Sequence, residues 1–293
     1  MRFLIEAALK ASGWNIASRR EVQIELRKAP EGLDYLLHDA AGRVLCVLEG
    51  KADPGAAPGI ERAACYAMKL DAPFVTTSNG QEHWFRTVRA PYRNDPIPVA
   101  RLPSRDDLER LHLKSLRPPR PLQSEKSSQL TRRGRPVLLA HRDVQAIAEI
   151  ALRFDAKRHR DFALRAPSAP GKSLLYAALI HCFLATRNAE RVLLVTEHME
   201  PARRALEEMN IFPGLRIEPL PGPRPSGGDA TVCVADRRSL VENRRYCLEF
   251  TPFHFDLVIA CHESASCPAE TENVVRYFQA ARIRLAGASY AAS

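Results

Sequence analysis

The chain has 293 residues, which is enough for two domains with separate hydrophobic cores. Its formal net charge of +9 favours a polyanionic partner, although many cytosolic proteins are equally basic without binding nucleic acid. No apolar run approaches the roughly 18 residues of a membrane span, an early acid excludes a secretory signal, and the seven cysteines lack zinc-like spacing, so we expect a cytoplasmic protein with reduced thiols.

A helix and a strand are predicted first. Residues 4 to 12 carry apolar side chains at helical spacing and are followed by Gly13, which is favoured after helix ends. Glu6 on this helix is either a solvated surface residue or a further carboxylate for the site described next. The alternating pattern of residues 21 to 26 predicts a half-buried strand.

A β-hairpin is predicted around a glycine-containing turn at residues 39 to 43, between two apolar runs. It brings Asp34, before the first run, close to Glu49 and Lys51, after the second. Strand alternation directs residues 49 and 51 to the same face. Two carboxylates can hold Mg²⁺ and a neighbouring lysine can stabilise charge on a phosphate. The alternative is an exposed hairpin end with a solvated Glu/Lys pair.

The first domain continues with alternating helices and strands. His83 is expected at a strand edge, and Trp84 and Phe85 are expected in the core. The predicted elements are a helix at 60–70, a strand at 73–77, a turn at 78–80, a strand from 82, and a helix at 106–112 capped by Ser104.

This order of elements resembles the PD-(D/E)XK nuclease core, and more narrowly the N-terminal domain of the restriction (R) subunit of type I restriction-modification enzymes. The resemblance rests on residues 4–14, the hairpin, and residues 61–67 and 72–85. It implies that Asp34 and Glu49 hold Mg²⁺, that Lys51 is the catalytic lysine, and that double-stranded DNA is the substrate. Where the family usually carries a glutamine on the helix after the hairpin, this chain has Arg62.

Residues 116–136 are rich in arginine, proline and serine, and predict a linker between a domain at 1–115 and a domain at 137–293. The basic residues of this linker either bind along the phosphate backbone of a nucleic acid or are solvated in a flexible connection.

The second domain is expected to be a parallel α/β sheet. A short strand, a loop ending in Gly-Lys-Ser and a helix give the context of a phosphate-binding loop. Helical segments separate further buried strands. The predicted elements are helices at 143–151 and 174–184, and strands at 162–164, 191–196, 231–235 and 255–259.

This half resembles the first RecA-like domain of superfamily 2 helicases, the part that follows the nuclease in type I R subunits. The resemblance implies that Gln145 reads adenine and that the loop residues Gly171, Lys172 and Ser173 bind the phosphates and Mg²⁺ of ATP.

The chain departs from that family at several positions. Ala169 and Pro170 stand in the phosphate loop, and proline removes a backbone N–H from the cradle. Cys261 and His262 replace the Asp-Glu pair that anchors Mg²⁺ and orients the attacking water. Residues 287–289 read Gly-Ala-Ser instead of Thr-Ala-Thr, and no second motor domain is expected after them. ATP hydrolysis is therefore not expected, and a nucleotide-free domain retained for packing is the alternative.

The sequence thus predicts a Mg²⁺-dependent endodeoxyribonuclease subunit with an inactive motor module. Methyltransferase and specificity subunits are the partners that the resemblance implies, and DNA sequence recognition would lie in the specificity subunit. The alternatives are a catalytically inactive DNA-binding or assembly protein, or a truncated product of a restriction subunit gene.

Overall fold

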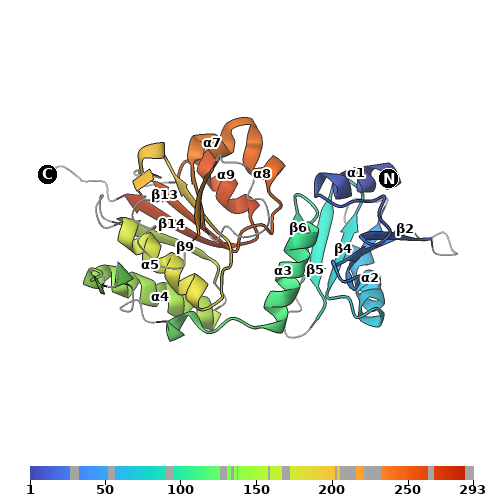
Figure 1. The fold of residues 1–293 in the computed structure, drawn as a ribbon, viewed down its shortest axis with the longest axis horizontal. Coiled ribbons are helices and arrows are strands. Elements are labelled where there is room, and N and C mark those ends of the chain that lie inside the picture. The colour runs from blue at the N-terminus through green and yellow to red at the C-terminus, as the bar shows by residue number, and fades with distance from the viewer. Residues whose placement is uncertain are drawn as a thin grey trace. The chain divides into compact units, whose positions relative to one another are not determined.

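The computed structural model forms two compact units, Met1–Pro118 and Pro119–Ser293 (Figure 1). None of the helices in the described residues is long and apolar enough to cross a membrane. The seven cysteines are free, and three of them are buried. The structure describes residues 1–26, 33–51, 57–89, 95–125, 131–132, 135–136, 138–157, 159–166, 172–201, 203–204, 216–220, 232–262 and 267–287.

The first unit is built on a mixed six-stranded sheet with the order β1-β2-β3-β4-β5-β6. Strands β3 and β4 pair in parallel, and the other neighbouring pairs are antiparallel. Its elements are α1 Arg2–Ala11, β1 Val22–Leu26, β2 Leu33–His38, β3 Val44–Gly50, α2 Ala57–Lys69, β4 Phe74–Ser78, β5 His83–Thr87, β6 Ile97–Val99 and α3 Arg105–Leu116.

Helix α2 is the crossover that makes β3 and β4 parallel, since parallel neighbours need a long connection over one face. It packs on that face through Ile60 and three small residues, and the strands supply Leu36, Val47 and Val75 beneath it. The small residues let the helix approach the sheet closely. They are Ala63, Ala64 and Ala67. The α2 face of the sheet is therefore the face of residues 36 and 47.

The predicted hairpin is confirmed: β2 and β3 pair antiparallel, and Gly42 in the turn has φ +83°, a conformation that glycine adopts without strain. Helix α1 ends at Ala11 as the position of Gly13 predicted. Helix α3 begins behind Ser104, which forms a capping box with Asp107, but continues to Leu116 rather than ending near residue 112. Strand β6 was not predicted, because three residues carry too little periodicity.

The second unit contains an all-parallel sheet with the order β11-β12-β10-β13-β14-β9, as the sequence predicted for its buried strands. Its elements are η1 Leu122–Ser124, β7 Thr131–Arg132, β8 Arg135–Pro136, α4 His141–Lys157, β9 Asp161–Ala166, α5 Lys172–Ala185, β10 Val192–Thr196, β11 Ile217–Leu220, β12 Val232–Asp236, α7 Arg237–Val241, η3 Glu242–Arg244, α8 Arg245–Glu249, β13 Leu257–His262, α9 Ala269–Tyr277 and β14 Ala281–Gly287.

Helices cover both faces of this sheet (Figure 1). Val192 and Leu194 of β10 point into a core with α4 and α5, whereas Leu193 and Val195 point into a second core with α7 and α9. Both faces are buried, so the strands are continuous apolar runs instead of alternating ones. This three-layer arrangement places the carboxyl ends of the strands along one edge, where ligands of open α/β sheets bind.

Part of the predicted linker packs on the second unit. Leu122 is buried in its core, and the Leu122 backbone N–H donates to Oδ1 of Asp155 at 2.9 Å. The Arg120 N–H donates to the Thr186 carbonyl, also at 2.9 Å. The first seven residues of the second unit are therefore held against its helices.

Candidate active site

The hairpin register places the predicted metal ligands opposite each other. In the β2–β3 ladder Asp34 pairs with Glu49, two positions beyond the pair Leu36 and Val47. Directly opposed residues in an antiparallel ladder share a face of the sheet. Positions 34 and 49 therefore both lie on the α2 face, although the side chain of Asp34 lies outside the described part of the structure.

Glu49 is buried, so the alternative of an exposed hairpin end with a solvated Glu/Lys pair is wrong for this residue. Only 3% of the side chain is exposed, because α2 covers the sheet up to this point. Its Oε1 atom accepts a charged hydrogen bond from Nη2 of Arg62 on α2 and lies 3.4 Å from Nζ of Lys51. The carboxylate is thus held between two cations.

Lys51 continues the strand beyond β3, and its side chain is 31% exposed. Its backbone N–H donates to the Ser78 carbonyl of β4 at 2.9 Å. Its side chain crosses the first turn of α2 at Gly59, where an added Cβ would lie 2.1 Å from Cε of Lys51. The glycine therefore leaves the space that the lysine needs to reach Glu49.

Position 34 and Glu49 supply the oxygen chemistry that a hard divalent cation prefers. The described residues contain no group of three or more histidine, cysteine, aspartate or glutamate side chains that could hold a metal by themselves. Glu49 fits the role of a ligand because it is an ionised oxygen donor at the end of a rigid strand. In this structure its charge is balanced by Arg62 and Lys51 instead.

Two further polar contacts border this part of the first unit. Arg86 of β5, a buried residue, donates to Oε1 of Glu61 at 2.5 Å. Oγ of Ser78 lies 2.7 Å from Nδ1 of His83. His83 is not the edge histidine that we expected: it is buried, and burial lowers its pKa to about 4. It is thus a neutral structural partner of Ser78 near pH 7.

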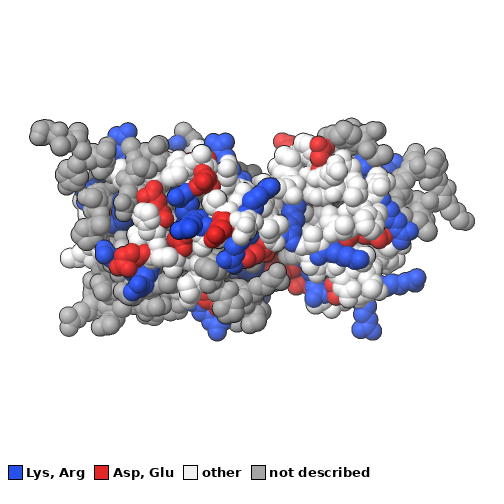
Figure 2. Space-filling model, turned by 90° about the horizontal axis from the view of Figure 1, so that it is seen from above, with Lys and Arg blue, Asp and Glu red and all other residues white. Residues whose placement is uncertain are grey.

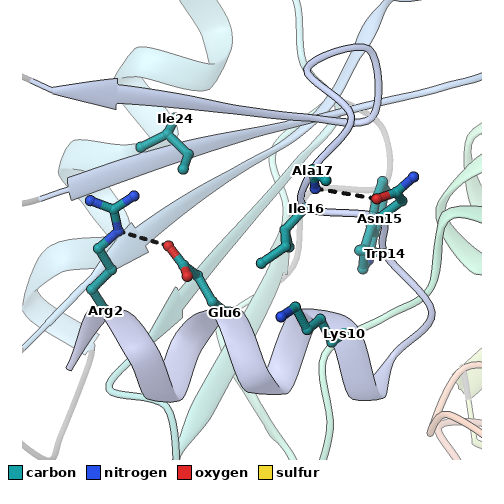
Figure 3. A pocket seen from close by; sticks show the side chains of 8 residues that line it. All are labelled: Arg2, Glu6, Lys10, Trp14, Asn15, Ile16, Ala17 and Ile24. Atoms are coloured by element: carbon teal, nitrogen blue, oxygen red, sulfur yellow. Dashed lines mark hydrogen bonds and ion pairs between the residues drawn. The ribbon is translucent and has the colours of Figure 1, made fainter.

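Glu6 lies away from Glu49. It accepts a hydrogen bond from Nε of Arg2 at 2.7 Å and raises the pKa of Tyr35, after the larger effect of burial, to about 12. Tyr35 alternates with Leu36, so it occupies the face opposite to α2. Glu6 and Arg2 line an open pocket of about 370 Å³ beside α1 (Figure 3). Glu6 therefore joins this pocket and not the Glu49 cluster.

Lys172 and Ser173, two of the residues predicted to bind phosphate, lie at the start of α5. Lys172 is its first residue, and its Nζ donates to the His262 carbonyl at the end of β13, at 3.3 Å. Ser173 follows on the first turn and is half-buried. Gly171, like Ala169 and Pro170, lies outside the described residues.

The end of β13 presents a thiol and an imidazole where the helicase family carries two carboxylates. Cys261 is half-buried, and desolvation raises its pKa to about 12, with a smaller lowering effect from Lys172. His262 is buried. A neutral thiol and a histidine at these positions leave Lys172 to bond with a backbone carbonyl.

Gln145 is exposed on α4, where its Nε2 atom lies 2.9 Å from Nε2 of His141 one turn earlier. Among the described residues its hydrogen bond is to this neighbour and not to Lys172.

Two contacts beside Glu49 were not predicted from the sequence: the bond from Arg62 and the packing of Lys51 on Gly59. Gly59 and Arg62 are three residues apart on α2, and this spacing could have indicated that they share a surface of the helix.

Comparison with known proteins gives structural similarities only. No protein-family model matches the chain, and no curated protein matches its sequence. A fragment assigned to an HsdR subunit of a type I restriction enzyme from Vibrio vulnificus YJ016 is 17% identical, with a TM-score of 0.39 over 98% of this chain and 54% of that one. The chain thus spans about half of that fragment.

Two nucleic-acid motor proteins are also similar. The SWI2/SNF2 ATPase core of Sulfolobus solfataricus, solved with double-stranded DNA, is 14% identical, with a TM-score of 0.41 over 52% of this chain and 32% of that one. The UvsW helicase of bacteriophage T4 is 12% identical, with a TM-score of 0.41 over 80% of this chain and 71% of that one.

Proposed function

We propose that this chain is a divalent-metal-dependent DNA endonuclease subunit. One observation carries the proposal: the hairpin ladder sets Asp34 opposite Glu49, and Nζ of Lys51 lies 3.4 Å from Oε1 of Glu49. Two acids and a lysine at one strand end are the residue types that phosphodiester hydrolysis requires.

Asp34 and Glu49 would hold Mg²⁺, which when bound supplies Lewis-acid activation of a phosphate and of water. The partly exposed Lys51 contributes a positive charge beside the phosphate, where it stabilises the charge that develops during cleavage. The position of its side chain is set by the ion pair with Glu49 and by the space that Gly59, which has no side chain, leaves for it. Preorganisation of this kind lowers the barrier without further movement of the lysine.

DNA is the polyanion that the net charge of +9 favours. The face of the molecule in Figure 2 shows basic and acidic side chains interspersed rather than one basic patch. Ion pairs such as Arg276–Glu272 and Arg237–Glu270 account for part of the basic charge of the second unit. DNA affinity should therefore depend on a limited number of phosphate contacts.

In the same proposal the second unit docks ATP or DNA phosphates weakly through Lys172 and Ser173 without turnover. Methyltransferase and specificity subunits of a restriction-modification complex are the proposed partners, and they would supply DNA sequence recognition. This part of the proposal rests on the family resemblance of the sequence motifs.

A catalytically inactive DNA-binding or assembly protein is the second candidate. Arg62 already neutralises Glu49, and Cys261 and His262 stand where a motor needs carboxylates. The residues at these three positions favour a protein that keeps the fold around both sites but catalyses neither DNA cleavage nor ATP hydrolysis.

Nicking of supercoiled plasmid by the purified chain separates the two candidates. The assay compares Mg²⁺ with EDTA, alone and with the partner subunits present. The variants Asp34→Asn, Glu49→Gln and Lys51→Ala should each lower cleavage by at least about a hundredfold, as is typical for the loss of a group that stabilises transition-state charge. Matched controls at exposed sites, Glu82→Gln and Lys69→Ala, should cleave like the unmodified chain.

Cleavage that requires metal and disappears in the three site variants supports the endonuclease. Absence of metal-dependent cleavage under all these conditions, with DNA binding retained, would instead establish the inactive binding protein.

A further inference from the structure

The carboxylate proposed as a metal ligand already has a cation bound to it. Arg62 reaches Glu49 from α2, one turn of helix after Gly59, and its guanidinium donates to Oε1. Glu49 is 3% exposed, and Arg62 is 37% exposed. A charged hydrogen bond to a carboxylate this deeply buried is stronger than a surface ion pair, because water competes poorly for it.

A divalent cation bound by Oε1 of Glu49 would need the atom that Arg62 already occupies. Metal ligation places the carboxylate oxygens about 2.0–2.6 Å from the ion, which leaves no room for a guanidinium on the same lone pair. Two positive charges would also repel each other at that distance. Metal and Arg62 therefore exclude each other at Oε1 of Glu49.

We infer that Arg62 is a resident competitor of the metal, a positioning residue that holds Glu49 when no metal is bound and must move away when one binds. This inference deepens the proposed endonuclease and rests on Glu49 being its ligand. Lys51 can remain near Glu49 in both states, because its ammonium lies 3.4 Å from Oε1 and its side chain is 31% exposed, so it can shift along Gly59 without leaving the site.

The same competition explains how a buried acid is tolerated before metal binds. Without Arg62, Glu49 would keep, among the described residues, the longer 3.4 Å contact with Lys51, and a buried carboxylate with incomplete hydrogen bonding is destabilising. The arginine therefore lowers metal affinity and stabilises the metal-free fold at the same time. These two effects have opposite signs and can be measured separately.

Mn²⁺ binding, measured by calorimetry without DNA, tests the inference independently of cleavage. Arg62→Gln should bind Mn²⁺ at least about tenfold more tightly than the unmodified chain, since a charge-assisted bond no longer has to be broken. Lys69→Gln, which removes an exposed charge from the same helix, should bind like the unmodified chain. Adding Asp34→Asn to Arg62→Gln should remove the gain, which locates the ion between residues 34 and 49.

Thermal unfolding provides the second readout. Arg62→Gln should melt at a lower temperature than the unmodified chain without metal, and Mn²⁺ should raise its melting temperature more, because a ligand that binds the folded state stabilises it. Arg62→Lys keeps a cation without the planar fork, so its affinity should lie between the two. It serves as the test if Arg62→Gln does not fold without metal.

Equal Mn²⁺ affinity in the unmodified chain and the Arg62 variants, or a gain that survives Asp34→Asn, would overturn the inference. Tighter Mn²⁺ binding without DNA cleavage would leave the inference standing and remove the endonuclease. If the unmodified chain cleaves DNA but the Arg62 variants bind Mn²⁺ no more tightly than it does, the endonuclease stands and the inference about Arg62 is overturned.

Discussion

Lys51 passes directly over Gly59, so that a Cβ at position 59 would lie 2.1 Å from Cε of the lysine. The contact joins the end of β3 to the first turn of α2 and leaves the Lys51 ammonium 3.4 Å from Glu49. Glycine is therefore needed at position 59 because it has no side chain to block Lys51, and not because of its backbone flexibility.

Gly59→Ala should displace Lys51 and lower metal-dependent DNA cleavage by about tenfold or more, because a small misplacement of a charged group weakens transition-state stabilisation. The free energy of unfolding should change by less than about 1 kcal/mol. The higher helix propensity of alanine stabilises α2 by about that amount and offsets the cost of displacing the lysine side chain. Plasmid nicking and urea denaturation measure the two effects.

The same substitution in a Lys51→Ala background is the control. With the lysine removed, Gly59→Ala meets no Cε atom, so it should cause no further loss of cleavage and should raise stability. A Gly59→Ala variant that cleaves at the original rate would show that Lys51 does not need this path.

Glu49→Ala should destabilise the chain by about 1–3 kcal/mol, the usual effect of removing one partner from a buried charged hydrogen bond. The loss is expected because only 3% of the Glu49 side chain is exposed, so water cannot replace the partners that it holds. Urea denaturation of Glu49→Ala beside Glu82→Ala, an exposed glutamate, measures the difference. Equal stability of the two variants would show that the contacts to Arg62 and Lys51 contribute little.

His83 should make stability depend on pH below neutrality. Burial lowers its pKa to about 4 in the fold, against an unfolded value near 6.5, so the unfolded chain binds the proton more readily. This contribution is present in full above about pH 6.5 and declines as pH falls toward 4. It amounts to at most about 3 kcal/mol.

His83→Asn keeps a hydrogen-bond acceptor for Ser78 and removes the titrating ring. The difference in unfolding free energy between the unmodified chain and this variant should shrink from pH 7 to pH 4. A difference that stays constant over that range would contradict the assignment of His83 as a buried neutral base.

ATP turnover should stay at background with or without DNA. Hydrolysis needs a carboxylate to anchor Mg²⁺ and a carboxylate base to orient water in this class of site, and Cys261 and His262 carry no carboxylate. Phosphate release by the unmodified chain and by Lys172→Ala should be equal, although Lys172→Ala should weaken any nucleotide binding. DNA-stimulated turnover that Lys172→Ala abolishes would show that another residue acts as the base.

Local pattern determined most of the architecture. The two apolar runs of the hairpin at residues 35–48 and the apolar runs of β10, β12 and β13 form strands as predicted, because a short continuous apolar run is typical of a strand that is buried on both faces. Strands β6 and β11 were not predicted. Strand β6 has three residues and β11 contains Pro219, so pairing with a neighbour decides their state more than composition does.

The sequence by itself also placed residues 34 and 49 near the same end of the hairpin, since an antiparallel ladder with a short turn brings its outer ends together. The register shift between Leu37 and His38 then sets the two residues directly opposite each other. Only the tertiary structure decided the environment of that pair. Helix α2 lies over the strand end, buries Glu49 and places Arg62 on its carboxylate. The spacing of Gly59 and Arg62 indicates a shared surface of the helix, but it does not specify that this surface meets Glu49, because that contact depends on how closely a helix with small alanine side chains can approach the sheet.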